Sequence, residues 1–126
     1  MNEYPGLVAT LAYDGLCSFE FGIALEVFAL PRSEFDFPWY RHVVVGVDQG
    51  PMRAANGVTL LAEYGLEQLA QADTIIIPGW RGNDVMPPQP LIDALRSAYA
   101  RGARFITICS GVFVLAAAGI LAGTRV

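Results

Sequence analysis

The sequence predicts an α/β domain of the flavodoxin-like class, a doubly wound parallel sheet with helices on both faces. Four short apolar runs are typical of strands buried on both faces, and they span 7–12, 43–47, 74–77 and 105–108. Segments with helical spacing of apolar residues follow several of these runs, as in chains that alternate strand and helix. With 126 residues, 54% of them hydrophobic and 16% charged, the chain is long enough for one domain and more apolar than an average one.

The first part of the chain is predicted to form a strand, a helix and a loop. The strand 7–12 ends at Tyr13-Asp14-Gly15, and a helix then begins at Glu20 and stops at Pro31. Its apolar stripe consists of Phe21, Leu25 and Phe28. The loop 31–41 carries Phe35, Phe37, Trp39 and Tyr40. We expect this aromatic loop to lie over the core or a partner, and a lid over a ligand is the alternative.

A hairpin and a short helix are predicted for the middle of the chain. Asn56-Gly57 is a strong turn signal between the segments 51–55 and 58–61, so it predicts a small hairpin. The segment 65–70 predicts a short helix with Leu66 and Leu69 facing inward.

The last part of the chain is predicted to alternate strand, helix, strand and helix. The strand 74–77 ends at Pro78-Gly79-Trp80, and a loop then leads to a helix that Pro90 opens and Gly102 closes. The inward positions expected for this helix are Leu91, Leu95, Ala98 and Tyr99. The run 105–108 predicts a buried strand, and helical spacing resumes through Val112, Leu115 and Ala116.

Residues 105–124 carry no charge, so a membrane span is an alternative for this stretch. Its first residues are strand-like, however, and it is interrupted by Ser110, Gly111, Gly119 and Gly123. The preceding segments also alternate strand and helix. We therefore expect no membrane segment.

Charge and cysteine content exclude several classes of protein. The net charge is −4 and the eight basic residues are scattered, so this chain alone is not expected to bind nucleic acid. Cys17 and Cys109 offer neither a disulfide framework nor metal-ligand spacing, and no metal or cofactor is expected. The N-terminus lacks the positive region of a signal peptide, which favours a cytoplasmic location.

The candidate site lies where the parallel strands end. Cys109 stands at an abrupt strand-to-helix corner, where the following N–H groups point at the corner residue and a thiol is placed as a nucleophile. Glu20 opens the first helix on the same edge and is the candidate proton acceptor. Gly79, Trp80 and Ser110 are candidate donors of backbone N–H groups to an oxyanion.

Each of these residues also has a purely structural interpretation. Cys109 can be a small buried hydrophobe, Glu20 a carboxylate favoured at a helix start, and the turn at Gly79 the mere end of a strand. Cys17 is expected to be packed. The single histidine, His42, opens the second strand, about 17 Å from this edge at about 3.3 Å per residue. Any base for Cys109 is therefore Glu20 or lies outside the chain.

Three segments carry a resemblance to a known family. They read YDGLCSFEFGIALEVFAL at 13–30, DTIIIPGWRG at 73–82 and GARFITICSGVFVLA at 102–116. Together they resemble the DJ-1/PfpI superfamily, which has the class I glutamine-amidotransferase-like fold. The resemblance is strongest to the N-terminal sensor domain of AraC-type transcriptional regulators.

The resemblance implies roles for the residues of the candidate site. Cys109 matches the cysteine of the nucleophile elbow, Glu20 the acid that hydrogen-bonds its thiol, and Glu26 the acid of the first helix. Gly79 and Trp80 take the place of paired glycines beside the oxyanion site, and the indole adds bulk that narrows or reshapes the pocket.

The resemblance also implies that the domain 1–126 is incomplete at its C-terminus. Family members continue into a strand that bears Thr-Thr-His, and the regulators add a helix-turn-helix domain. Both are expected to be missing here. An incomplete sheet exposes an apolar edge, which favours a homo-oligomer.

Three functions stay open from the sequence. The first is the small-molecule-sensing or dimerisation domain of an AraC-type regulator, without chemistry of its own. The second is a cysteine-dependent hydrolase, hydratase or deglycase-like enzyme, in which Cys109 attacks and Glu20 accepts the proton. The third is a truncated fragment without a function. The missing histidine favours the first of them.

Overall fold

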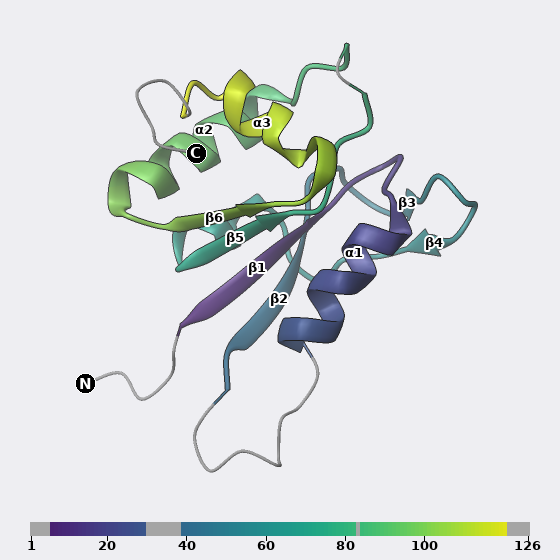
Figure 1. Ribbon diagram of the computed structural model, residues 1–126, viewed down its shortest axis with the longest axis horizontal. Coiled ribbons are helices and arrows are strands. Elements are labelled where there is room, and N and C mark those ends of the chain that lie inside the picture. The colour runs from purple at the N-terminus through teal and green to yellow at the C-terminus, as the bar shows by residue number, and fades with distance from the viewer. Residues whose placement is uncertain (1–5, 30–38, 83, 121–126) are drawn as a thin grey trace.

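The computed structural model describes residues 6–29, 39–82 and 84–120. Its centre is a four-stranded sheet in the order β2-β1-β5-β6 (Figure 1). The strands are β1 (Leu7–Ala12), β2 (Arg41–Gly46), β5 (Thr74–Ile77) and β6 (Arg104–Thr107). All three neighbouring pairs are parallel. The predicted α/β class with a parallel sheet is confirmed.

Helices cover both faces of this sheet (Figure 1). One face carries α1 (Ser18–Ala24), which continues as the π-helical turn η1 (Leu25–Ala29). The other face carries α2 (Gln89–Arg101), α3 (Val112–Ala117) and the 3₁₀ turn η2 (Leu66–Ala70). None of the helices in the described ranges is both long and apolar enough to cross a membrane.

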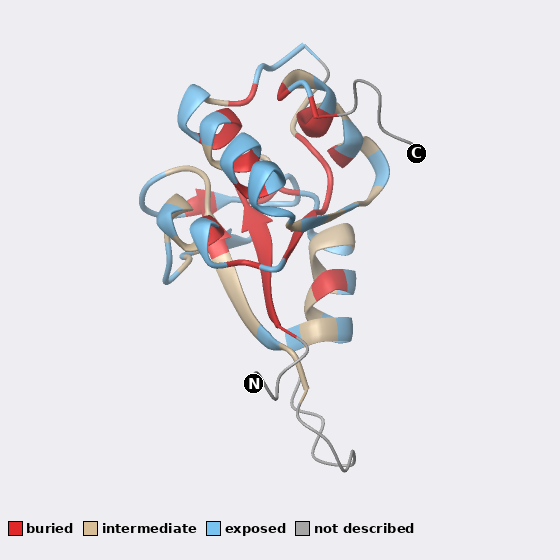
Figure 2. Cartoon of the chain, turned by 90° about the vertical axis from the view of Figure 1, so that its left-hand side faces the viewer, coloured by how far each residue is buried: buried red, intermediate tan, exposed pale blue. Residues whose placement is uncertain are grey.

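The two faces of the sheet bury very different amounts of apolar surface. Side chains alternate along each strand, so Ile75 and Ile77 of β5 pack toward α2 while Ile76 packs toward α1. The cluster on the α2 side contains most of the buried side chains, whereas the cluster on the α1 side consists of Val8, Ala24 and Ile76. Figure 2 shows the buried residues gathered on the central strands and on the inward sides of the helices.

Turn and cap residues place several elements as the sequence predicts. The strands β3 (Met52–Arg53) and β4 (Thr59–Leu60) pair antiparallel around Asn56-Gly57, and Gly57 has a φ of 94°. Helix α2 contains Pro90 in its first turn and is capped by Gly102, whose φ of 97° is left-handed. The hairpin and both ends of this helix are confirmed.

The prediction that 105–108 is a fully buried strand is wrong. Strand β6 lies at the edge of the described sheet, so its residues alternate between exposed and half-buried, and Ile106 is 39% exposed. The packing expected for α3 is also shifted, because a 3₁₀ turn precedes it and changes the helical phase. Val112 is exposed, and Val114 and Leu115 face the core.

Three smaller expectations also need correction. The first helix begins at Ser18 rather than Glu20, and its stripe of Phe21, Leu25 and Phe28 is half-buried beside a single buried residue, Ala24. Tyr99 is 47% exposed, because its ring lies against Phe105 of the edge strand. In the aromatic loop, Phe35 and Phe37 lie outside the described residues, and Trp39 and Tyr40 are half-buried.

Candidate functional site

Cys109 stands at the corner between β6 and α3 in a strained backbone conformation. Its φ is 55°, and among the described residues it alone is a non-glycine residue with positive φ. Such a conformation costs a side-chain-bearing residue about 1–2 kcal/mol. The residue is exposed and opens the 3₁₀ turn η3 (Cys109–Gly111). The corner therefore presents a thiol to solvent, as the sequence predicts; its role as a nucleophile stays a prediction.

Gly111 holds this corner against the end of β5. A Cβ on Gly111 would overlap the carbonyl oxygen of Ile77 and lie 3.1 Å from the backbone nitrogen of Gly79. Ile108 also donates its N–H to the Ile77 carbonyl oxygen at 3.0 Å. Only glycine allows so close an approach of two backbones. The two loops of the candidate site are thus built as one unit.

A pair of hydrogen bonds links Trp80 to Ser110. The Trp80 N–H donates to the Ser110 hydroxyl oxygen at 3.0 Å, and that hydroxyl donates to the Trp80 carbonyl oxygen at 3.3 Å. The N–H of Trp80, which was predicted to serve an oxyanion, is therefore occupied within the protein. Gly79 lies beside this pair, buried and left-handed with a φ of 122°.

The Trp80 side chain is buried in the core rather than standing free in the site. It is 4% exposed and belongs to the large apolar cluster. Its indole N–H donates to the Val85 carbonyl oxygen at 2.7 Å. The Arg81 guanidinium lies over the ring, 4.6 Å from its centroid. The indole that this residue adds to the family pattern therefore packs on the core side of the turn at Gly79 and Trp80.

Glu20 and Cys17 share this edge with Cys109. The thiol of Cys17 has a raised pKa, first because of partial burial and then because of the charges of Glu20 and Cys109. Within the described ranges no hydrogen bond is found between Glu20 and Cys109, and the pairing that the family resemblance implies stays a prediction. Cys17 was expected to be packed, but it is exposed, because it occupies the N-cap position of α1.

Tyr13 is the residue of this site that sequence reasoning missed. It follows β1 directly and is fully buried, with its ring tilted against Trp80 at 4.9 Å between centroids. Its hydroxyl has no hydrogen-bond partner among the described residues. Burial raises the pKa of this phenol well above its usual range, and the charges of Cys17, Glu20 and Cys109 add to that effect. The sequence signal that could have identified Tyr13 is its position directly after an apolar strand.

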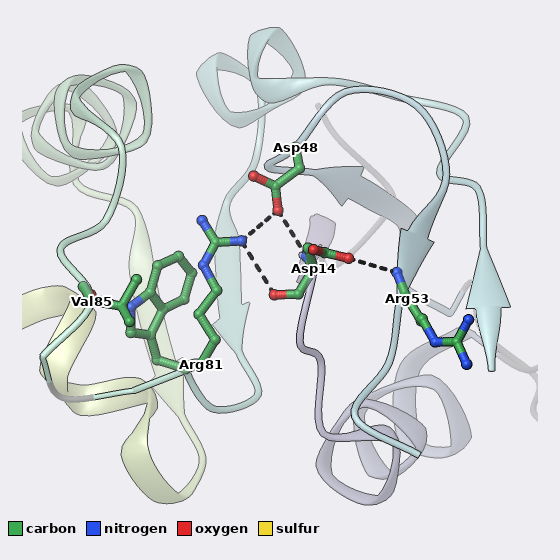
Figure 3. Close-up of polar contacts among 6 residues, drawn as sticks. Asp14, Asp48, Arg53, Arg81 and Val85 are labelled. Atoms are coloured by element: carbon green, nitrogen blue, oxygen red, sulfur yellow. Dashed lines mark hydrogen bonds and ion pairs between the residues drawn. The ribbon is translucent and has the colours of Figure 1, made fainter. Parts of the chain in front are cut away.

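A second feature absent from the sequence analysis is an ionic cluster that ties three loops together (Figure 3). Arg81 pairs with the Asp48 carboxylate at 2.6 Å and donates to the Asp14 carbonyl oxygen at 3.2 Å. The Asp14 carboxylate in turn accepts the N–H of Arg53 at 2.9 Å. These bonds join the loops after β1, β2 and β5 to the hairpin. They fix the carboxyl edge of the sheet.

His42 lies away from this site, as the sequence predicts. It is the second residue of β2 and stands beside Val8 of β1. Its Nε2 and the Thr10 hydroxyl are 2.7 Å apart, and burial lowers the pKa of the imidazole. The described residues hold no cluster of three metal-ligating side chains.

A groove of about 370 Å³ lies outside the Cys109 corner. It is bordered by α1, η1, β2 and the segment 60–64. Phe21 and Leu25 contribute from the helical side, and His42 contributes from β2.

Comparison with known proteins assigns the family. The model of the DJ-1/PfpI family matches residues 7–126. The chain belongs to the DJ-1/PfpI family. Its fold is also that of Drosophila melanogaster DJ-1beta, with a TM-score of 0.73 and 24% identity over 91% of this chain and 61% of the fly protein.

Relatives by sequence fall into more than one functional class. An uncharacterised protein of the cpoL 5′ region of Streptomyces lividans is 31% identical over 99% of this chain and 88% of its own length. The isonitrile hydratase of Pseudomonas putida is 34% identical over 65% of this chain and 36% of the enzyme. The HTH-type transcriptional regulator CdhR of Pseudomonas aeruginosa is 32% identical over 74% of this chain and 28% of the regulator. The chain thus spans about a third of the enzyme and of the regulator.

Proposed function

We propose that this chain is the small-molecule-sensing domain of an AraC-type transcriptional regulator. It binds its ligand at the carboxyl edge of the sheet beside Cys109 and does not convert it. DNA contact would come from a helix-turn-helix domain outside these residues. The relationship to a helix-turn-helix regulator supports this assignment.

The proposal is supported by the hydrogen bonds that the groups around Cys109 make and lack. The Trp80 N–H is bonded to the Ser110 hydroxyl at 3.0 Å, so it is not free for an oxyanion. Glu20 is not hydrogen-bonded to the thiol, and the nearest histidine along the sheet is bonded to Thr10. A nucleophile is commonly activated by a base within hydrogen-bond reach. The corner fits binding better than catalysis.

A ligand titration tests this proposal. The wild-type chain is titrated with an alkyl isonitrile and followed by its melting temperature, which rises with ligand occupancy. The same samples are analysed for the N-alkylformamide that hydration would form. We expect a rise in melting temperature without product, and the same rise in Cys109→Ala. Product that disappears in Cys109→Ala would contradict the sensing role.

The second candidate is a cysteine-dependent hydratase, favoured by the exposed thiol and its φ of 55°. In that reaction the Cys109 sulfur adds to the isonitrile carbon while the carbon gains a proton through Glu20. Water then displaces the sulfur, so the formamide leaves and the thiol is restored. The N–H of Trp80 would have to leave the Ser110 hydroxyl to join the N–H of Ser110 in stabilising charge.

Self-association is a further part of the proposal. The exposed side of α1 and η1 carries Phe19, Ile23 and Val27, with 76%, 40% and 44% of each exposed. Apolar residues at this spacing form one stripe on a helix. We expect the chain to form a homo-oligomer, and light scattering would measure its mass. We also expect a cytoplasmic location.

A further inference from the structure

The buried hydroxyl of Tyr13 lacks the partner that such groups almost always have. Tyr13 is 0% exposed, and no described residue accepts or donates a hydrogen bond at its oxygen. Native proteins pair the large majority of buried polar atoms, so an unpaired one calls for an explanation. A hydroxyl that is retained without a protein partner fits a partner that arrives from outside.

No side chain separates this hydroxyl from the turn at Gly79. Apart from its chain neighbours, only two atoms lie within 4 Å of the point where a Cβ on Gly79 would stand. They are the hydroxyl oxygens of Tyr13, at 3.3 Å, and Ser110, at 3.8 Å. Gly79 and Ser110 belong to the two loops that build the Cys109 corner, and Tyr13 reaches them from the end of β1, where its ring packs against Trp80. The Tyr13 oxygen is closed to water here, so entry of a ligand atom includes a small shift of the Gly79 turn.

The charges around Tyr13 decide which ligand atom fits beside it. The phenol stays neutral at physiological pH, since burial and nearby negative charge raise its pKa, and it is therefore a hydrogen-bond donor. Negative charge on Glu20 would repel an anion. Arg81 is the nearby cation, but its guanidinium is already paired with Asp48 at 2.6 Å. An uncharged acceptor fits these surroundings, and a carboxylate does not.

We propose that the Tyr13 hydroxyl donates a hydrogen bond to an uncharged acceptor atom, such as an amide or ketone oxygen, of the small molecule bound at the Cys109 corner. Tyr13 is then the residue that selects neutral carbonyl compounds over carboxylates. This assignment rests on the function proposed above, because it defines the ligand chemistry of the same site.

Protection of Cys109 from methyl iodide tests the assignment, because this reagent has no acceptor atom of its own. Acetamide and acetate serve as a neutral and an anionic ligand of nearly the same shape. Peptide mass spectrometry follows Cys109 and Cys17 separately, and each rate is divided by the rate of the same variant without ligand. We expect acetamide, but not acetate, to slow methylation of wild-type Cys109. Tyr13→Phe should need about tenfold more acetamide for the same protection.

Tyr99→Phe is the matched control, because Tyr99 is an exposed residue of α2 that lines neither the Cys109 corner nor the groove beside β2. It should be protected like the wild type. Equal protection of Tyr13→Phe and the wild type would overturn the assignment, and so would protection by acetate. Failure of acetamide to protect the wild type would also overturn it. The isonitrile titration tests the proposed function independently of these results.

Stability separates this role from a merely structural one. Removal of an unpaired buried hydroxyl should leave the melting temperature of Tyr13→Phe equal to or above that of the wild type. If the variant does not fold, the ¹³Cζ resonance of Tyr13 in the wild-type protein gives the answer. It should move on addition of acetamide, and a resonance that stays unchanged at saturating protection would overturn the assignment.

Discussion

The two ends of the parallel sheet handle their polar groups in different ways. At the amino ends, Asp73 accepts the Leu7 N–H at 2.8 Å, and Arg101 donates to the carbonyl oxygens of Leu69 and Ala72 at 2.8 and 2.9 Å. At the carboxyl ends, the Tyr13 hydroxyl is unpaired and Cys109 is held at a φ of 55°. The Arg81 cluster fixes the loops there but satisfies neither of these two groups.

This difference indicates that the amino ends of the strands contribute to stability and the carboxyl ends to function. Paired groups at one end contribute to the free energy of folding. An unpaired donor and a strained backbone persist only if the surrounding structure holds them, and such features gather at functional sites. We therefore expect substitutions at the amino end to be destabilising. Relief of strain at the carboxyl end should be stabilising.

The largest effect is expected from Gly111→Ala, which would break the contact that builds the carboxyl edge. The new Cβ would overlap the Ile77 carbonyl oxygen, a backbone atom that cannot move aside. The free energy of unfolding should fall by about 3 kcal/mol or more in urea denaturation. Gly22→Ala is the control, because no atom beyond its chain neighbours and its own helix backbone lies within 4 Å of its Cβ position. It should stabilise α1 by about 0.5–1 kcal/mol.

A smaller loss is expected from Asp73→Ala at the amino end. The substitution leaves the N–H of the buried residue Leu7 without its carboxylate partner. Urea denaturation should show a loss of about 1–2 kcal/mol. Asp93→Ala removes an exposed carboxylate that accepts a hydrogen bond from the Gln89 amide, and it should change stability by less than about 0.5 kcal/mol. Equal effects of the two substitutions would remove the contrast between the ends.

Relief of strain at the corner should produce a gain. Cys109→Gly places a residue that tolerates positive φ at 55°, so stability should rise by about 1 kcal/mol in the same assay. Cys17→Gly is the matched control, since Cys17 has a φ of −85° and gains nothing from glycine. A loss of stability in Cys109→Gly would show that the corner is not strained.

The smallest effect concerns pH and His42. Burial lowers its pKa in the folded state, so between the folded and unfolded pKa values the unfolded chain binds more protons. The free energy of unfolding should therefore decrease as the pH falls below about 6.5, the usual value for histidine. Denaturation at pH 7 and 5.5 should show a smaller decrease in His42→Gln. A larger decrease in the variant would contradict the burial effect.

Local patterns were sufficient to predict most of the fold. Strand β5 and the helix between Pro90 and Gly102 follow from apolar runs and cap residues, which act within a few positions of the chain. The exposure of β6 could not be predicted in the same way. The exposure of β6 depends on which strands lie beside it, and the apolar run FITI is the same in an edge strand and in a central one.

The candidate site was only partly accessible to sequence reasoning. The corner at Cys109 follows from a strand, small residues and a helix in succession. The bond from Trp80 to Ser110 and the unpaired hydroxyl of Tyr13 depend on distances between loops 30 or more residues apart. No local pattern encodes those distances. The same holds for the cluster of Asp14, Asp48 and Arg81.

The most direct test of the central claim is an NMR map of ligand binding to the whole chain. Backbone amide shifts of the ¹⁵N-labelled protein are recorded while acetamide is added. We expect the amide shifts to change at Gly79, Trp80 and Ser110 and to stay unchanged at Leu7 and Asp73. The changes should reach saturation while the NMR signal of acetamide stays unaltered. Shifts confined to the groove between α1 and β2, or conversion of acetamide to acetate, would contradict this expectation.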